Sequence, residues 1–126
     1  PFDDEIGLEF TELGPDGVRA QLELRPKLWQ PTGIVHGGVY CSIIESVASV
    51  SAYLWLNEDG SAGGNVVGVN NNTDFLRAVS SGTVRAASVP IHRGRRQQLW
   101  LVTITDGDDR LVARGQVRLQ NLDPAG

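Results

Sequence analysis

The eighteen residues from Val39 to Leu56 are so apolar that the rest of the chain has to cover them. A membrane span is a poor interpretation, because Glu45 and four serines interrupt the run. We therefore predict a buried helix. A chain of 126 residues can form one core around such a helix. We expect a single domain over residues 1–126.

Period-two patterns on both sides of this segment predict strands. Apolar side chains alternate with polar ones from Val18 to Leu24, and the turn at 14–17 predicts a hairpin with an earlier strand. Four more strands are expected at 66–75, 83–91, 99–105 and 111–119, the last two joined by a turn at 106–109. One helix with about six strands predicts an α+β fold, in which a curved antiparallel sheet wraps one long central helix.

The start of the predicted helix has the features of an oxyanion site. Gly37 and Gly38 leave room for a carbonyl oxygen to approach main-chain N–H groups that have no acceptor within the helix. The positive end of the helix dipole favours developing negative charge at the same place. His36, next to the glycines, and Gln30, seven residues before Gly37, could add hydrogen-bond donors.

Glu45 follows two helical turns later, between Ile44 and Val47. An unpaired carboxylate in apolar surroundings costs roughly 1–5 kcal/mol of folding free energy. Such a residue is therefore expected to have a partner or a chemical role. Ser49 lies on the same helical face at i+4 and could hydrogen-bond the carboxylate. A glutamate that reaches solvent or a structural partner is the alternative interpretation.

Composition limits the classes of partner and compartment. The net charge of −4 and the pI near 5.0 argue against a general nucleic-acid binder or a protein of anionic membrane surfaces. Cys41 is the single cysteine, which excludes an internal disulfide and fits a reducing compartment, and we expect it to be an ordinary buried side chain. No leader pattern is expected at the N-terminus, so the predicted location is cytoplasmic. Two histidines and one cysteine without ligand spacing predict no metal site. No cofactor is expected either, because main-chain N–H groups and a carboxylate can act without one.

Four segments carry a common pattern: Gln30–Gly38 with Glu45 and Ser49, then Ala52–Leu54, Val66–Gly68 and Pro90–Arg95. Together they resemble the hotdog-fold acyl-CoA thioesterases, and the resemblance covers nearly the whole chain. The chain looks most like the branch with a catalytic glutamate, which includes 4-hydroxybenzoyl-CoA thioesterase and the menaquinone-pathway thioesterase for 1,4-dihydroxy-2-naphthoyl-CoA.

The resemblance implies hydrolysis of an aromatic acyl-CoA to free acid and CoA. It implies that the Gly37 N–H polarises the thioester carbonyl, with His36 and Gln30 assisting, while Glu45 acts as nucleophile or general base, with Ser49 positioning it. It also implies substrate and CoA contacts from Gly38, Gly68, Phe75, Leu76, Arg77, Ala78, His92, Arg93, Gly94, Arg95, Arg96 and Gln97. The resemblance also implies that the site forms between two subunits. We therefore expect a homodimer as the minimum unit and expect two dimers to pair into a homotetramer.

Several alternatives stay open at this point. The arginines of the 92–97 segment could bind CoA phosphates or form a solvated rim at a strand end near Pro90. The acyl group could be aliphatic, or the chain could bind acyl-CoA without cleaving it. A hotdog hydratase is disfavoured, because neither histidine has an aspartate at the spacing such enzymes use. Tyr53, Trp55 and Trp100 are expected to be core or interface aromatics, or a wall for an aryl group.

Overall fold

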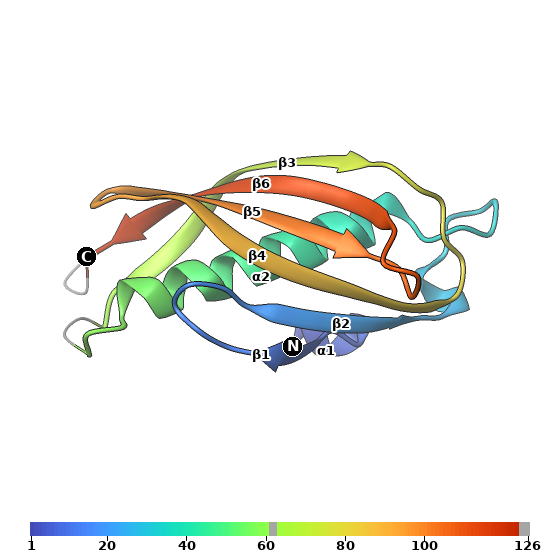
Figure 1. Ribbon diagram of the computed structural model, residues 1–126, viewed down its shortest axis with the longest axis horizontal. Coiled ribbons are helices and arrows are strands. Elements are labelled where there is room, and N and C mark those ends of the chain that lie inside the picture. Colours follow the sequence, from blue (N-terminus) through green and yellow to red (C-terminus); the bar gives the residue numbers. More distant parts are fainter. Residues whose placement is uncertain (61–62, 124–126) are drawn as a thin grey trace.

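Helix α2 (Gly37–Leu56) lies along the concave side of one curved antiparallel sheet in the computed structural model (Figure 1). The structure describes residues 1–60 and 63–123, and the other five positions of the predicted 1–126 domain lie outside that description. The sheet has six strands in the order β1-β2-β4-β5-β6-β3. This is the predicted α+β hotdog architecture, so the fold prediction is confirmed.

The strand bounds agree with the predicted runs to within a few residues. In chain order the strands are β1 (Glu9–Glu12), β2 (Arg19–Leu24), β3 (Asn65–Phe75), β4 (Gly82–Arg93), β5 (Gln97–Thr105) and β6 (Leu111–Leu122). Two short elements were not predicted: helix α1 (Phe2–Ile6) and a 3-10 helix at Pro26–Leu28. Helix α1 is attached to α2 by a hydrogen bond from Ser46 Oγ to Asp3 Oδ1, at 2.7 Å.

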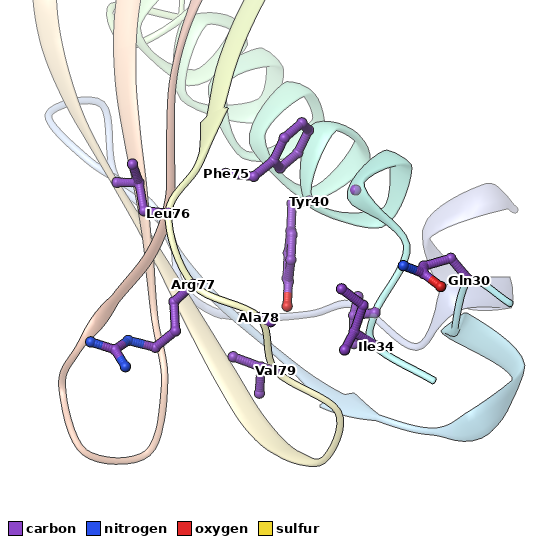
Figure 2. Close-up of a pocket in the computed structure, with 10 residues that line it drawn as sticks. Gln30, Ile34, Tyr40, Phe75, Leu76, Arg77, Ala78 and Val79 are labelled. Atoms are coloured by element: carbon purple, nitrogen blue, oxygen red, sulfur yellow. The ribbon is translucent and has the colours of Figure 1, made fainter. Parts of the chain in front are cut away.

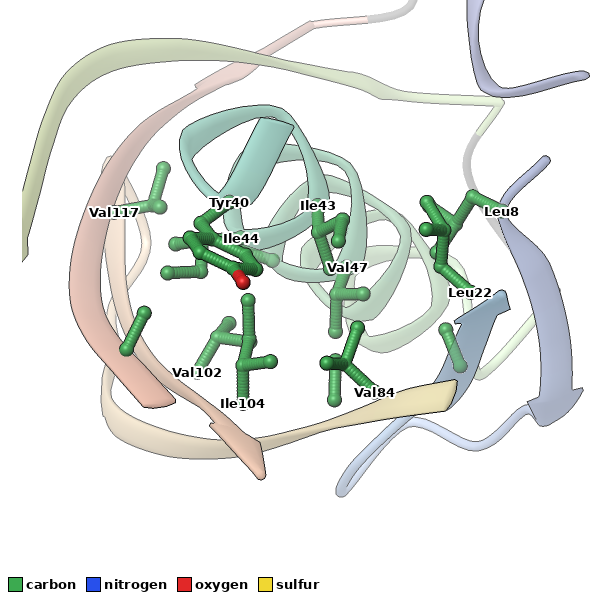
Figure 3. Close-up of a cluster of buried hydrophobic side chains, with 14 of the residues drawn as sticks. Leu8, Leu22, Tyr40, Ile43, Ile44, Val47, Val84, Val102, Ile104 and Val117 are labelled. Carbon is green, nitrogen blue, oxygen red and sulfur yellow. The ribbon is translucent and has the colours of Figure 1, made fainter. Parts of the chain in front are cut away.

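The burial pattern of α2 explains its place in the fold. Its buried residues recur every three or four positions: Tyr40, Ile43, Ile44, Val47, Ala48, Ser51 and Ala52. They pack against the inward side chains of the strands, such as Val102 and Ile104 of β5 (Figure 3). Within the described ranges α2 is the one helix long and apolar enough to cross a membrane, and its buried face is that of a core helix. The predicted buried helix is therefore buried on one face and open on the other.

Close approach of α2 to the sheet depends on a glycine in β6. A Cβ built at Gly115 would lie 2.6 Å from Thr73 Oγ1 and 3.0 Å from Ile44 Cγ2. Both distances are shorter than ordinary contacts. The missing side chain thus lets α2 and β3 pack tightly against β6, and this contact places the first half of the helix beside β3.

Candidate active site

A cavity of about 500 Å³ opens beside the first turn of α2 (Figure 2). It is bounded by the segment before the helix, by the helix itself and by the segment that follows β3. Its lining residues are Gln30, Ile34, Val35, Gly37, Tyr40, Phe75, Leu76, Arg77, Ala78 and Val79. The fold thus brings Gln30, Gly37 and residues 75–78, all predicted to be site residues, to one place. We call this hollow the acyl pocket.

The helix start leaves one main-chain donor free at this pocket. His36 is the N-cap residue, and its Nδ1 accepts a hydrogen bond from the Gly38 N–H at 2.8 Å. The Gly37 N–H has no hydrogen-bond partner in the described part of the chain. The Phe75 ring lies over it, 3.0 Å from a Cβ built at Gly37. Of the two predicted glycines, Gly37 is therefore the one that can donate to a bound carbonyl.

The structure changes the expected role of His36 and Gly38. His36 is exposed, and because its Nδ1 accepts a hydrogen bond, its proton lies on Nε2. The Gly38 N–H was predicted to be a substrate contact and instead completes the helix cap. His36 is consequently a capping residue that can offer only its Nε2–H to a ligand.

Gln30 is held at the pocket by a tight turn. Its N–H donates to the Ile34 carbonyl at 2.8 Å, and its carbonyl accepts from Gly33, whose φ of 90° suits a glycine. The side-chain Oε1 accepts hydrogen bonds from the N–H and the hydroxyl of Thr32. Because the oxygen is occupied, the Nε2 donors remain for a ligand in the pocket.

Glu45 is not in the apolar surroundings that the sequence predicted. Its side chain is exposed, and it has no ion pair or hydrogen bond within the described ranges, the expected one from Ser49 included. It lies over Gly68 of β3: a Cβ atom added at Gly68 would be 3.9 Å from Glu45 Cδ. The physical reason is that position 45 falls on the open face of α2, one residue beyond the buried stripe at Ile43 and Ile44.

A second, smaller hollow surrounds Glu45. Its volume is about 170 Å³, and its walls are Phe2, Cys41, Ser42, Glu45, Ser46 and Asn71. Cys41 is half-buried in this wall, rather than fully buried in the core as predicted. Glu45 follows Gly37 by eight residues, which corresponds to ~12 Å along a helix. One chain therefore holds the oxyanion donor and the carboxylate in two separate places.

The arginines of the turn between β4 and β5 have different environments. Arg93 donates to Asp16 Oδ1 at 2.7 Å and to the Pro15 carbonyl at 3.1 Å, and its guanidinium stacks on Trp55 and Trp100. These contacts occupy Arg93 within the fold, contrary to its predicted role as a phosphate ligand.

Arg95 and Arg96 keep their guanidinium groups free of ion pairs in the described part of the chain. They border a hollow of about 530 Å³ at the C-terminal end of α2. Asn121 anchors the turn by donating to the Gly94 and Arg95 carbonyls, each at 3.0 Å. Of the other predicted contacts, Gly94 packs on His92, and Gln97 bonds Gln120 and Arg118. This turn lies at the opposite end of the sheet from the acyl pocket (Figure 1).

The aromatic wall consists of residues other than the expected ones. Tyr53, Trp55 and Trp100 do not line the acyl pocket, and Trp100 is fully buried in the core. Tyr40 and Phe75 line it instead. Tyr40 could have been found from the sequence, because it follows Gly37 by three residues and thus lies on the same helical face.

Comparison with known proteins shows the family to which the chain belongs. The family model described as "Thioesterase superfamily" matches residues 32–113. "Putative esterase Rv1847" of Mycobacterium tuberculosis is 72% identical over 123 residues, which cover 98% of this chain and 87% of that protein. A solved structure of this mycobacterial protein superposes with a TM-score of 0.94 at 71% identity, covering 98% and 97% of the two chains. "Proofreading thioesterase EntH" of Cronobacter turicensis is 36% identical and covers 85% of this chain and 75% of its own length. The chain belongs to the thioesterase superfamily and is a thioester hydrolase of the hotdog fold.

Proposed function

We propose that this enzyme hydrolyses aromatic acyl-CoA thioesters to the free acid and CoA. The observation that carries the proposal is the unpaired Gly37 N–H at the mouth of an apolar pocket walled by Tyr40 and Phe75. A thioester carbonyl at Gly37 would receive a hydrogen bond that strengthens as the oxyanion develops. The acyl group would then extend into the pocket, where a planar ring can stack on aromatic side chains and loses few rotors on binding.

The reacting carboxylate is supplied by a second copy of the chain. Attack requires the reacting atoms to approach within about 3–3.5 Å, whereas Gly37 and Glu45 of one chain are separated by ~12 Å along the helix. Glu45 is also exposed and without a partner within the described ranges, as expected for a carboxylate that acts on a substrate held by another subunit. Glu45 of one subunit therefore faces the acyl pocket of the other.

Strand β3 provides the geometry for this pairing. It is an eleven-residue edge strand with exposed Val67 and Val69, and such an edge favours pairing with another strand. Gly68 near its start lies under Glu45, and Phe75 at its end lies over Gly37. A two-fold axis between Asn71 and Asn72 would pair Gly68 with Phe75 of the second copy. Each Glu45 is then brought towards the Gly37 of the other chain, and a homodimer contains two equal sites.

Two chemical routes use these same groups. In one, the Glu45 carboxylate attacks the thioester carbon, the C–S bond breaks, CoA leaves as its thiolate and takes a proton from solvent, and water cleaves the resulting mixed anhydride. In the other, Glu45 removes a proton from water as that water attacks the carbonyl; the tetrahedral intermediate then collapses with cleavage of the C–S bond, and the CoA thiolate leaves with the proton that Glu45 returns. A burst of one equivalent of thiol per site, without an equal burst of free acid, identifies the anhydride route, because the acyl group is then still attached to the enzyme.

The CoA phosphates are assigned to Arg95 and Arg96. Both guanidinium groups are free within the described ranges, and planar guanidinium matches phosphate oxygens. Their turn is joined through Asn121 to the start of β3, where Asn121 pairs with Val66. This is the end of β3 at which Glu45 lies. One subunit thus supplies the carboxylate and the phosphate contacts, and the other supplies the acyl pocket.

We place the enzyme in the cytoplasm, where its single cysteine stays reduced and acyl-CoA is available. The menaquinone branch and the homotetramer remain predictions from the resemblance. The name of the Cronobacter relative refers to proofreading, which is another context for thioester hydrolysis. The substrate therefore has to be identified by assay.

The decisive assay measures thiol release from a panel of acyl-CoA thioesters. We expect benzoyl-, 4-hydroxybenzoyl- and 1,4-dihydroxy-2-naphthoyl-CoA to have higher kcat/KM than palmitoyl-CoA, because the pocket of about 500 Å³ suits one or two rings. If palmitoyl-CoA exceeds benzoyl-CoA by about tenfold, the aromatic assignment is wrong and an aliphatic substrate replaces it. The Glu45→Gln variant is the control for non-enzymatic hydrolysis.

A further inference from the structure

Tyr40 lines the acyl pocket, and its hydroxyl group is a buried polar atom without a hydrogen bond. The residue is 3% exposed, and its Oη has no partner among the described residues. Figure 2 shows the ring pointing from α2 into the space between Phe75, Val79 and Ile34, with the hydroxyl at its far end. Buried polar groups in folded proteins nearly always have a partner, so this one requires an explanation.

The surroundings define what such a partner can be. The neighbouring pocket walls are the aliphatic side chains of Ile34, Val35 and Val79. Arg77 also lines the pocket, but its side chain is directed away from Tyr40 (Figure 2). No charged group therefore faces the hydroxyl, and a charged partner would be buried there without compensation. The fitting partner is neutral.

We propose that Tyr40 is a specificity-determining residue that hydrogen-bonds a neutral hydroxyl or oxo substituent on the acyl group. This inference rests on the proposed function. A phenol hydroxyl rotates, donates and accepts, so it can pair with either substituent. Burial raises the pKa of Tyr40 to about 12, which keeps its proton in place throughout the range of ordinary assays.

The helix sets the relative position of the two polar ends of the pocket. Gly37 and Tyr40 are three residues apart and share one helical face. A ring whose thioester carbonyl lies at Gly37 is therefore directed towards the Tyr40 hydroxyl. Within one chain Phe75 and Leu76 are 55% and 56% exposed, so few contacts from their own subunit hold these side chains at the pocket.

The predicted consequence is discrimination between substituted and unsubstituted rings. A hydroxylated ring gives Tyr40 the hydrogen bond that it lacks in the free protein, whereas benzoyl leaves the hydroxyl unpaired, as it is before binding. The wild-type enzyme should prefer at least one of 2-, 3- and 4-hydroxybenzoyl-CoA over benzoyl-CoA by about tenfold or more in kcat/KM.

The test compares Tyr40→Phe with Tyr53→Phe, which makes the same chemical change at an exposed site on the same helix. Tyr40→Phe should lower the ratio of kcat/KM for the preferred hydroxybenzoyl-CoA to kcat/KM for benzoyl-CoA to about one, because both rings then meet the same apolar side chain. Tyr53→Phe should keep the wild-type preference. Because Tyr40→Phe removes an unpaired polar atom, its Tm should equal or exceed that of the wild type. An equal loss on hydroxybenzoyl- and benzoyl-CoA, or no wild-type preference for any isomer, overturns the proposal.

A binding measurement separates this proposal from the proposed function. Calorimetry with benzoate and the three hydroxybenzoates requires no catalysis. If the wild type cleaves none of the thioesters but binds one hydroxybenzoate more tightly than benzoate, and Tyr40→Phe abolishes that difference, the hydrolysis assignment fails and the Tyr40 assignment stands. Equal binding of all four acids by both proteins, or no binding, overturns the Tyr40 assignment.

Discussion

At the scale of single residues, Glu45 is the group whose surroundings matter most. In one chain it is a solvated carboxylate over Gly68, and the chemistry proposed for it begins only when a thioester held at another subunit's Gly37 comes within reach. In the proposed dimer, a nearby oxyanion site, and not burial in the monomer, distinguishes Glu45 from other exposed glutamates such as Glu58.

The first prediction follows from this distinction. Glu45→Ala should lower kcat by on the order of a thousandfold with little change in KM, because it removes the reacting group and leaves the binding contacts. Glu45→Gln should behave similarly, since the amide keeps the shape and lacks basicity. Glu58→Ala is the matched control and should retain wild-type rates. A Glu45→Ala enzyme that keeps more than about a tenth of wild-type turnover would exclude the mechanism.

A second prediction concerns Asp106 in the β5–β6 turn. The Arg110 N–H donates to its carboxylate at 3.0 Å and holds its pKa below the ordinary value of 3.8, an effect that burial opposes and that the Asp108 N–H and the Arg110 side chain reinforce. Because the folded pKa is the lower one, the carboxylate stabilises the fold above about pH 3.8, and this contribution is lost as the pH falls further.

Asp106→Asn should therefore lower Tm at pH 7, and the difference from wild type should shrink below about pH 3.8. Thermal unfolding of both proteins between pH 2.5 and pH 7 would measure this difference in Tm. Asp108→Asn, whose side chain is 79% exposed, should change Tm much less. A Tm difference for Asp106→Asn that is constant across this range would show that charge is not the cause.

At the scale of elements, the turn between β4 and β5 combines a structural arginine with free ones. Arg93 is attached to the β1–β2 connection through Asp16 and Pro15, whereas Arg95 has no ion pair within the described ranges. Two arginines separated by one glycine therefore have different roles. Their identical chemistry makes them a matched pair for mutation.

We predict that Arg93→Ala lowers Tm, because about 1–3 kcal/mol of charge-assisted hydrogen bonding is lost, and leaves KM unchanged. Arg95→Ala should raise KM for benzoyl-CoA and leave Tm and the KM for benzoyl-pantetheine unchanged, since that substrate lacks the nucleotide phosphates. Thermal unfolding and initial rates on both substrates would separate the two roles. Equal effects of Arg95→Ala on the two substrates would assign it to the fold.

The elements were predictable to the extent that their patterns are local. The alternation in β2, the apolar run of α2 and the aspartate-rich turn before β6 each determine one element by side-chain period or turn chemistry. Helix α1 is five residues long, and it is held by tertiary contacts such as the one between Asp3 and Ser46. Such contacts leave no periodic signal in the sequence.

In the candidate site, too, some features follow from local sequence patterns and others from tertiary contacts. Gly37 was found because the chemistry of a helix start depends on adjacent residues, and Gln30 was found because its spacing of seven residues from Gly37 matches the family pattern. The exposure of Glu45, the contacts of Arg93 and the unpaired hydroxyl of Tyr40 depend on which helical face the sheet covers and on which turns meet in space. Long-range packing decides these features, and residue order alone does not record them.

At the scale of the whole molecule, β3 connects two unlike functions at its two ends. Its start carries Gly68 beneath Glu45, and its end carries Phe75 over Gly37. In the proposed dimer each site combines the start of one β3 with the end of the other. Activity should consequently fall on dilution below the dimer dissociation constant, together with the dimer signal in analytical ultracentrifugation.

The division of β3 into two ends has a genetic consequence. Glu45→Ala and Gly37→Val, each inactive alone, should complement each other when they are co-expressed with different tags. A mixed dimer would assemble one site from two wild-type halves and one from two damaged halves, so random pairing should restore about a quarter of wild-type activity. Mixing Glu45→Ala with Glu45→Gln should restore none. An allele damaged in the pocket and an allele damaged in the carboxylate would thus rescue each other in one cell, although both lie in the same gene.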